Sequence, residues 1–385
     1  MERDELSAWL RLQLTPGVGS GSGRKLLARF GLPPQIFAQD IATLGSCVSA
    51  KQADSLRQIP DGLEDLLQTT WEWMAQNPQQ RHVLTLGDPR YPAALLDTED
   101  PPLLLYAMGD AAHLEHGWAC SASTSIAVVG SRNPTAQGVA NARQFSQTLT
   151  QAGLTVVSGL ALGIDGAAHE GALEGAAPGQ LATIAVVGTG LDRVYPKAHF
   201  QLAHRIAQQG LLISEYPLGT PPLSANFPKR NRIISGLARA TLVVEAALQS
   251  GSLITARLAV DQGKDVFAIP GSIHATQARG CHALIKQGAK LVESAQDILE
   301  EFALPTEAAR TAQADTERTG SAMGGLSEVE QSLLSALAFE PAGLDALQAR
   351  TGLDTPTLQA LLMGLELQGH VARLPGSLFQ RQALA

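Results

Sequence analysis

The strongest constraint on the fold is a regular alternation of short apolar runs and helix-length segments that begins at residue 126. The apolar runs lie at 126–129, 154–158, 181–187, 211–214, 240–244, 265–269 and 289–292, and the main helical segments lie at 137–152, 198–209, 253–262 and 281–287. Uninterrupted runs of aliphatic and β-branched residues are typical of strands that are buried on both faces of a parallel sheet. The alternation therefore predicts an α/β domain with a doubly wound, mostly parallel sheet of the extended Rossmann type.

The chain is too long for one ordinary domain, since it has 385 residues, and its 45% apolar content is enough for a sizeable core. Composition divides it into five parts. These are a helical domain at 1–75, a Pro-rich connecting extension with short strands at 76–124, the Rossmann-like domain at 125–303, an Ala-, Thr- and Gly-rich flexible linker at 304–325, and a domain at 326–385. The last part predicts three short helices and a hairpin, which is the pattern of a winged helix.

Charge is distributed unevenly along the chain. The formal net charge of −8 would by itself argue against a nucleic-acid partner. Residues 1–125 hold nine Lys or Arg against fifteen Asp or Glu, and residues 304–385 hold five against nine. Residues 126–303 hold fourteen against twelve, so only this middle part is positive.

Cysteine usage and hydropathy indicate a cytoplasmic protein. Cys47, Cys120 and Cys281 are scattered and form no CxxC pair, so neither a disulfide framework nor a zinc site is predicted. The N-terminus is acidic and has no signal-peptide pattern. No apolar run approaches the roughly 20 residues that a membrane span needs, so no membrane association is expected.

A basic cluster and a small-residue turn flank the predicted strand at 240–244. The cluster is Lys229, Arg230 and Arg232 around Asn231, close to Phe227, and the turn is Ser250-Gly251-Ser252, which follows Glu245 and precedes a predicted helix. A strand, a turn of small residues and a helix together present backbone N–H groups to an anion. An exposed charge run beside an ordinary loop is the other interpretation. We favour an anion site because an aromatic residue and a proline adjoin the cations.

Three further loops follow predicted strands, and open α/β sheets bind ligands at that carboxyl edge. Gly130-Ser131-Arg132 offers a turn, a hydroxyl and a guanidinium suited to phosphate, although a capped turn with an exposed arginine would look the same. The second loop runs from Ser158-Gly159 to Gly163, and Asp165 is predicted to be the N-cap of the helix that follows. The third contains Gly188 and Gly190, with Lys197 beyond them.

The order and spacing of these loops resemble the DNA-processing protein A family, also called DprA or Smf. The stretches FPKRNRIISGLARATLVVEA and SGSLITARLAV carry most of the resemblance, which covers roughly residues 126–293. It implies a protein that binds incoming single-stranded DNA, protects it and loads the recombinase RecA onto it during natural transformation. It also implies a homodimer formed through the Rossmann domain, a SAM-like N-terminal domain and no cofactor.

Carried over residue by residue, the resemblance predicts a DNA-binding site made of Gly130, Ser131, Arg132, Ser158, Gly159, Gly163, Gly188, Gly190, Lys197, Phe227, Lys229, Arg230, Asn231, Arg232, Ser250, Gly251 and Ser252. We expect the cations to contact phosphates and Phe227 to stack on a base, as in sequence-independent single-strand binding. Asp165 and Glu245 are expected to have structural or orienting roles. For Glu245 two interpretations stay open: it orients an arginine, or it is a buried partner without direct function.

The two flanking domains are less informative. The helices before and after Thr15-Pro16-Gly17-Val18-Gly19 resemble a helix-hairpin-helix, whose amides can touch a phosphate, but a plain helix-connecting turn fits equally. The predicted third helix of the winged helix, 354–369, contains no Lys or Arg. Because such a helix cannot supply phosphate contacts in a major groove, we expect this domain to bind a protein or to pack on a neighbour.

The competing class is a Rossmann-type nucleotide hydrolase of the phosphoribohydrolase kind. Such enzymes carry a PGGxGTxxE loop with a catalytic carboxylate in the helix that follows. The helix predicted at 253–262 has Thr255, Arg257 and Asp261 but no Glu one turn from its start, and no catalytic triad or metal-ligand cluster stands out elsewhere. We therefore expect a binding protein without catalytic residues, a metal or a cofactor.

Overall fold

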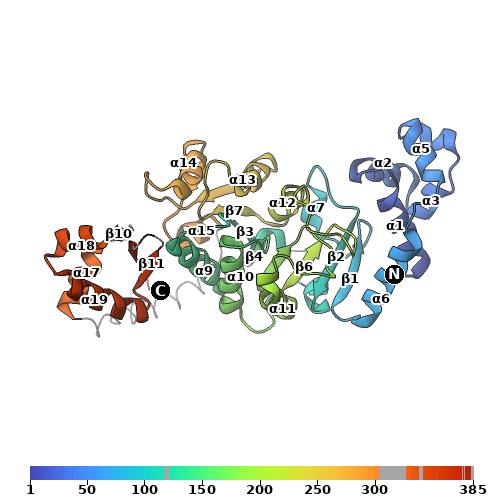
Figure 1. Cartoon of the computed structure of the whole chain (residues 1–385). Helices are drawn as coiled ribbons and strands as arrows, with labels where there is room; N and C mark the ends of the chain where they lie inside the picture. Colours follow the sequence, from blue (N-terminus) through green and yellow to red (C-terminus); the bar gives the residue numbers. More distant parts are fainter. Residues whose placement is uncertain (117–120, 303–326, 338–340, 375, 377, 383–385) are drawn as a thin grey trace.

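The structure is a computed structural model that describes residues 1–116, 121–302, 327–337, 341–374, 376 and 378–382. The predicted linker at 304–325 lies outside the described residues. In the part that is described, a nine-stranded sheet has the order β1-β2-β6-β5-β4-β3-β7-β8-β9, and helices cover both of its faces (Figure 1).

The parallel part of the sheet confirms the predicted fold class. Its strands are β3 (Ser125–Val129), β4 (Thr155–Ser158), β5 (Thr183–Val186), β6 (Leu211–Ser214), β7 (Ala240–Val243), β8 (Asp265–Ala268) and β9 (Lys290–Leu291). Each of them runs parallel to its neighbours in this group. Every residue of β3 to β7 is buried, which explains why these runs lack polar alternation.

The segment predicted as a connecting extension belongs to the same sheet. It provides β1 (Arg81–Thr85) and β2 (Leu104–Gly109), with the short helices α7 (Ala93–Leu96), α8 (Ala111–His116) and η1 (Ser121–Thr124). β1 pairs antiparallel with β2, and β2 pairs antiparallel with β6, with Tyr106 opposite Ser214. The sheet therefore starts well before residue 126, and its first two strands form an antiparallel edge.

Two helical layers enclose the sheet (Figure 1). One consists of α7, α12 (Asn226–Leu237), α13 (Ser252–Asp261) and α14 (Arg279–Lys286), and the other of α9 (Ala136–Gln151), α10 (Ile164–Gly175), α11 (Phe200–Gln209) and α15 (Ala295–Phe302), with η2 (Lys197–His199) and η3 (Thr276–Ala278) in connecting loops. α10 lies very close to α9, because a Cβ on Gly171 would be 2.0 Å from the carbonyl oxygen of Arg143. Only glycine allows that approach.

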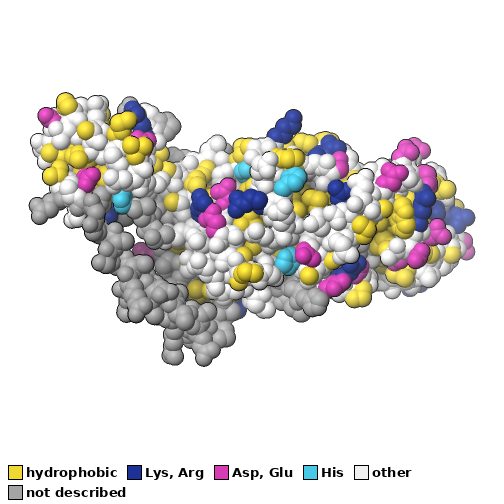
Figure 2. Space-filling view, turned by 90° about the horizontal axis from the view of Figure 1, so that it is seen from below, with side chains coloured by type: hydrophobic (Ala, Val, Ile, Leu, Met, Phe, Trp, Pro, Cys, Tyr) yellow, Lys and Arg dark blue, Asp and Glu magenta, His cyan; other side chains and the backbone are white. Residues whose placement is uncertain are grey.

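The N-terminal region is helical, as predicted. Its elements are α1 (Arg3–Leu14), α2 (Ser20–Phe30), α3 (Pro33–Phe37), α4 (Ile41–Gly45), α5 (Ala50–Arg57) and α6 (Leu63–Gln76). They enclose a core of their own around Leu12, Leu26 and Ile36. α1 and α6 also pack through Trp9 and Trp73 on the antiparallel edge of the sheet. Acidic and basic side chains lie interspersed over this end of the molecule (Figure 2).

The C-terminal region has the elements of a winged helix. These are α17 (Glu328–Leu337), β10 (Ala342–Gly343), α18 (Leu344–Thr351), α19 (Thr355–Leu367), β11 (Val371–Leu374) and β12 (Leu378–Arg381). The strands form an antiparallel sheet in the order β10-β12-β11. α19 begins where Asp354 accepts a hydrogen bond from the N–H of Thr357, and it exposes Met363 and Leu367.

Candidate functional site

The strand order reverses beside β3, and a cavity opens at that point. From β3 the chain proceeds through β4, β5 and β6 on one side and then crosses to β7 on the other side of β3. Open α/β sheets bind ligands at such a switch point, outside the carboxyl ends of the strands. The cavity has a volume of about 700 Å³, and among the predicted site residues it is lined by Gly130, Ser131, Arg132, Asp165, Phe227, Arg230, Asn231, Ser250, Gly251 and Ser252.

Glu245 anchors the backbone of the loop after β3, and Arg132 on the same loop is exposed. The N–H of Ser131 donates to the carbonyl of Glu245 at 2.7 Å, and the N–H of Thr135 donates to the Glu245 carboxylate at 2.9 Å. Glu245 thus anchors this loop and contacts Thr135 rather than an arginine, so the hypothesis that it orients an arginine is not supported. Arg132 is exposed and has no ion pair among the described residues.

An aromatic pair forms the wall next to Arg132. The guanidinium carbon of Arg132 lies 5.5 Å from the ring centroid of Phe227, and the Tyr195 ring lies 5.6 Å from the Phe227 ring. Tyr195 is about half exposed and lines the cavity. Tyr195 was not among the predicted site residues, although a Tyr-Pro pair lies just before Lys197 in the sequence. A flat apolar surface therefore adjoins a cation.

The start of α13 also lines the cavity, through Ser250, Gly251 and Ser252. Gly251 precedes the helix without a side-chain cap, and the hydroxyls of Ser250 and Ser252 share a hydrogen bond of 2.7 Å. Asn231 reaches across from α12, where its amide donates to the carbonyl of Gly251 at 3.4 Å. The N-terminal end of a helix carries a partial positive charge, so this wall favours an anion.

Asp165 and Arg230 form a buried pair at the inner end of the cavity. The prediction that Asp165 is the N-cap of α10 was wrong. Gly163 has that position, and Asp165 lies inside the first turn. Its Oδ2 is 3.9 Å from Nη2 of Arg230, and the two residues are 7% and 4% exposed. Burial raises the pKa of the Asp165 carboxyl, and the nearby Arg230 opposes that rise.

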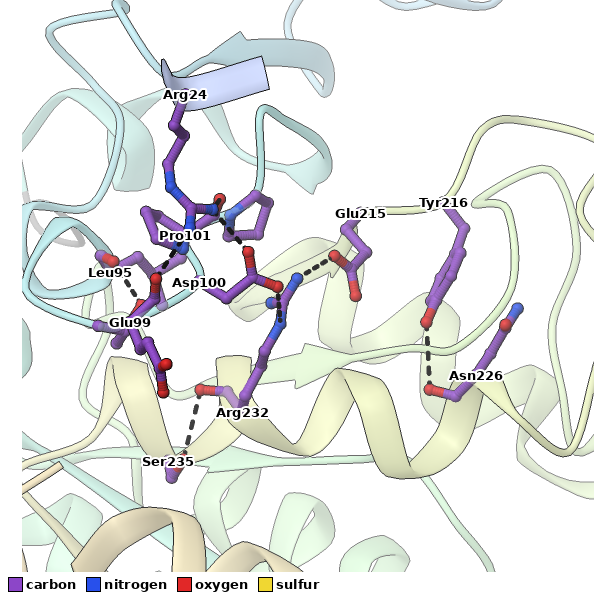
Figure 3. A network of polar contacts seen from close by, with 12 residues as sticks. Arg24, Leu95, Glu99, Asp100, Pro101, Glu215, Tyr216, Asn226, Arg232 and Ser235 are labelled. Atoms are coloured by element: carbon purple, nitrogen blue, oxygen red, sulfur yellow. Dashed lines mark hydrogen bonds and ion pairs between the residues drawn. The ribbon is translucent and has the colours of Figure 1, made fainter. Parts of the chain in front are cut away.

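The basic cluster does not precede α12 but forms part of its first turns. Successive residues of a helix are rotated by about 100°, so neighbouring cations point in different directions. Lys229 is exposed, and Arg230 points inward to the sheet. Arg232 points away from the cavity and pairs with Glu215 and with Asp100, the latter at 3.3 Å (Figure 3). The predicted cluster is therefore split between two environments.

Arg232 belongs to a polar network that joins α12 to the N-terminal helices. Asp100 also accepts from Nη1 of Arg24 on α2, at 2.6 Å (Figure 3). Gln13 on α1 donates to the carbonyl of Glu215 at 3.0 Å. Burial raises the pKa of the Glu215 carboxyl, and Arg232 opposes that rise. We call Arg24, Asp100, Arg232 and Glu215 the junction network.

The other predicted site residues support the cavity or lie outside it. The hydroxyl of Ser158 is buried and donates to the carbonyl of Val128 at 2.6 Å. A Cβ on Gly188 would lie 3.1 Å from the Phe227 ring, and one on Gly190 would lie 2.7 Å from a backbone carbonyl. Lys197 is exposed at the start of η2 and does not line the cavity. Gly159 and Gly163 lie in the loop between β4 and α10, where the N–H of Gly159 donates to the carboxylate of Asp165.

The described ranges contain neither a metal-ligand cluster nor a helix of membrane-spanning character. The described His, Cys, Asp and Glu residues form no group of three or more that could hold a metal ion. None of the helices built from the described residues is long and apolar enough to cross a membrane.

Fold and site together define a Rossmann-like protein that has a cavity with an exposed arginine at its switch point, and that carries a helical region before the sheet and a winged-helix region after it. The family model for DNA recombination-mediator protein A matches residues 82–303, and the model for the DprA winged helix domain matches residues 308–377. The chain belongs to this DNA-processing family.

Relatives and solved structures agree with this assignment. The chain is 36% identical to protein Smf of Synechocystis sp. over 99% of its length and 100% of the relative, and 40% identical to protein Smf of Escherichia coli over 79% and 78%. It resembles the X-ray structure of DNA processing protein A from Streptococcus pneumoniae with a TM-score of 0.62 and 36% identity, over 78% of this chain and 98% of that one. A structure of the Helicobacter pylori protein, described in terms of its single-stranded DNA binding mode, matches with a TM-score of 0.50 and 31% identity, over 57% and 95%.

Proposed function

We propose that the cavity binds single-stranded DNA without sequence preference. The observation that carries this proposal is that one cavity is lined by Arg132, which has no ion pair among the described residues, by the rings of Phe227 and Tyr195 beside it, and by the positive end of α13. A phosphate fits between the guanidinium and the helix start, and a base fits on the aromatic surface. Phosphate contact combined with stacking is how single strands are bound independently of sequence.

The family membership supports further steps of the same proposal. We propose that the chain acts as a homodimer through its Rossmann-like domain and loads RecA onto the DNA that it holds. The winged helix binds another protein in this proposal, because α19 lacks cations and exposes Met363 and Leu367. Pull-down of purified RecA with the full-length chain and with a variant ending at residue 302 tests whether RecA binds the Rossmann-like part or the winged helix.

Binding of labelled oligo-dT and oligo-dA at four salt concentrations tests the DNA site. Each phosphate contact on a single strand contributes about 0.7 to the slope of log affinity against log salt. We expect Arg132→Gln to flatten the slope by about that amount for both oligonucleotides. Phe227→Ala should keep the slope and weaken binding by about 1–3 kcal/mol through the lost stack.

A folded Arg132→Gln variant with the wild-type slope would contradict the proposed site. Normal binding by Phe227→Ala would assign Phe227 to packing alone. Duplex DNA of the same length serves as the competitor that tests strand preference. Incubation with nucleoside monophosphates tests the hydrolase class, which predicts release of the base.

A further inference from the structure

The loop between β4 and α10, residues 159–163, has an unusual backbone. Leu160 has a φ of +57° although it is not glycine, and its side chain is buried. Gly163 also has a positive φ, of +82°. Residues with a side chain avoid this region, and such a conformation persists where the surrounding structure imposes it. The groups that impose it are therefore of interest for the shape of the cavity.

Asp165 holds this loop at two backbone positions. Its Oδ2 accepts hydrogen bonds from the N–H of Gly159 at 3.1 Å and from the N–H of Ala161 at 3.3 Å. These two groups flank Leu160, whose carbonyl accepts a hydrogen bond from Nδ1 of His199 at 3.0 Å. A single carboxylate oxygen thus fixes both sides of the residue with the strained backbone.

Arg230 holds the same carboxylate and the same loop from α12. Its Nη1 donates to the carbonyl of Val186 at the end of β5, at 3.1 Å. The guanidinium lies directly against Gly159, where an added Cβ would be 1.5 Å from Nη1. Arg230 therefore links α12, β5 and the loop after β4, and the glycine at 159 makes room for it.

Arg230 lines the cavity, but most of its guanidinium is enclosed or paired, since Nη1 donates to Val186 and Nη2 lies 3.9 Å from Oδ2 of Asp165. Its Nε has no hydrogen-bond partner among the residues that the structure describes, but this atom has almost no exposed surface, so a phosphate cannot reach it in this arrangement. The whole residue is 4% exposed. Arg132 differs on both counts, since it is exposed and has no ion pair among the described residues. The two arginines of the cavity thus have different roles available to them.

We propose that Arg230 is a positioning residue: with Asp165 it fixes the loop 159–163 that shapes the cavity, and it does not itself neutralise a DNA phosphate. This proposal rests on the proposed single-strand binding. It makes Asp165 beneficial to DNA binding although its charge is negative. Simple electrostatics predicts the opposite, because removal of an acid near an anion site should tighten binding.

The test measures oligo-dT affinity at four salt concentrations for Asp165→Asn, Arg230→Met and Arg132→Met in the full chain. We expect Asp165→Asn and Arg230→Met to weaken binding about tenfold or more, with the salt slope of the wild type. Arg132→Met should flatten the slope by about 0.7. Asp261→Asn is the matched control, because it removes the same charge from an exposed position at the far end of α13 and should leave affinity unchanged.

Amide hydrogen exchange in the absence of DNA provides a second measurement. We expect the amides of residues 159–163 to exchange faster in Asp165→Asn than in the wild type, while the rest of the sheet keeps its protection. This measurement also applies if the wild-type chain binds no oligonucleotide, which would overturn the proposed function but not the positioning role. If Arg230→Met does not fold, Asp165→Asn gives both readouts. Tighter binding by Asp165→Asn, a flatter slope for Arg230→Met, or unchanged exchange would each overturn the positioning role.

Discussion

Two charged regions lie on opposite sides of α12, and each takes one arginine from it. At the cavity, Arg230 and Asp165 pair in the interior, and Arg132 is exposed with no ion pair to any residue that the structure describes. In the junction network, Arg232 pairs with Glu215 and Asp100, and Asp100 pairs in turn with Arg24, so no charge of that network is left over. Because the net charge is balanced at one region and positive at the other, only the cavity is suited to attract an anion.

The difference shows that distance along the sequence is a poor guide to shared function on a helix. Arg230 and Arg232 are two residues apart, which on an α-helix is a rotation of about 200°. The Arg230 side chain points to the sheet, where it donates to Val186. The Arg232 side chain points to Glu215 and Asp100, towards the N-terminal helices (Figure 3). Variants that affect one region without the other can test this division.

The largest effect is expected for Arg232→Met in the junction network. The change leaves the Glu215 carboxylate, whose side chain is 13% exposed, without its main partner. Breaking a buried pair from one side costs about 3–5 kcal/mol, so the free energy of unfolding should fall by that amount. Chemical denaturation monitors the loss, and the salt slope of oligo-dT binding should stay at the wild-type value.

Two further variants sharpen this prediction. Arg232→Met combined with Glu215→Leu should recover much of the lost stability, because no unpaired charge remains buried. Arg193→Met removes an exposed pair with the adjacent Asp192 and should cost less than about 1 kcal/mol. A flatter salt slope in Arg232→Met would show that Arg232 contacts phosphate and would remove the distinction between the two regions.

The next largest effect is expected at the cavity, for Gly159→Ala. The added methyl group would overlap the guanidinium of Arg230, which is enclosed and cannot move aside without breaking its contacts. Overpacking of this kind costs about 1–3 kcal/mol. We expect both lower thermal stability and weaker oligo-dT binding, whereas Arg232→Met affects stability alone. Normal binding by a destabilised Gly159→Ala would mean that the loop does not shape the site.

A third prediction concerns His169, which is fully buried on α10 and has no counterpart in the junction network. Its Nδ1 donates to Thr183 Oγ1 at 2.7 Å, because that hydroxyl donates to the carbonyl of Val156. Burial, with smaller contributions from His199 and Arg230, lowers the pKa of His169 to about 3. The unfolded chain binds this proton below about pH 6.5, so stability is lost as the pH falls from there towards 3.

The expected slope for this single group is about 1.4 kcal/mol per pH unit between pH 6 and pH 4. The raised pKa values of Asp165 and Glu215 act in the opposite direction, since their contributions are lost as the pH rises. The difference between wild type and His169→Asn isolates the histidine. Equal pH dependence of the two proteins would show that His169 is not buried in its neutral form.

Much of the fold could be predicted from the sequence, because buried parallel strands leave an unambiguous apolar pattern. β1 and β2 were placed outside the sheet, since short strands among prolines give no such pattern and their pairing with β6 is a long-range contact. The loops of the cavity were also predictable, as each follows a buried strand.

The parts of the site that were missed depend on where a side chain points rather than on which residue it belongs to. Nothing in the order KRNR says which cation points inward, because that is set by where α12 begins. Asp165 was assigned to a helix cap, yet the structure uses it one turn back, on the amides of Gly159 and Ala161. The inward direction of Arg230 follows from the packing of α12 over β5, and the Asp165 contacts follow from the backbone conformation of the loop 159–163; the residue types alone display neither.

The smallest effect is expected for Lys229→Gln, and it defines where the positive region ends. Lys229 is exposed on α12 between the two regions and has no ion pair among the described residues. Its replacement should change the free energy of unfolding by less than about 0.5 kcal/mol. If the DNA path continues from the cavity over α12, the salt slope should fall by up to about 0.7, as for Arg132→Gln, and if it ends at Phe227 the slope should stay unchanged. We expect a partial decrease of the salt slope, because an exposed lysine near a bound strand exchanges counterions without a fixed contact. A decrease of the full 0.7 would extend the proposed DNA site towards the junction network and weaken the division between the two regions.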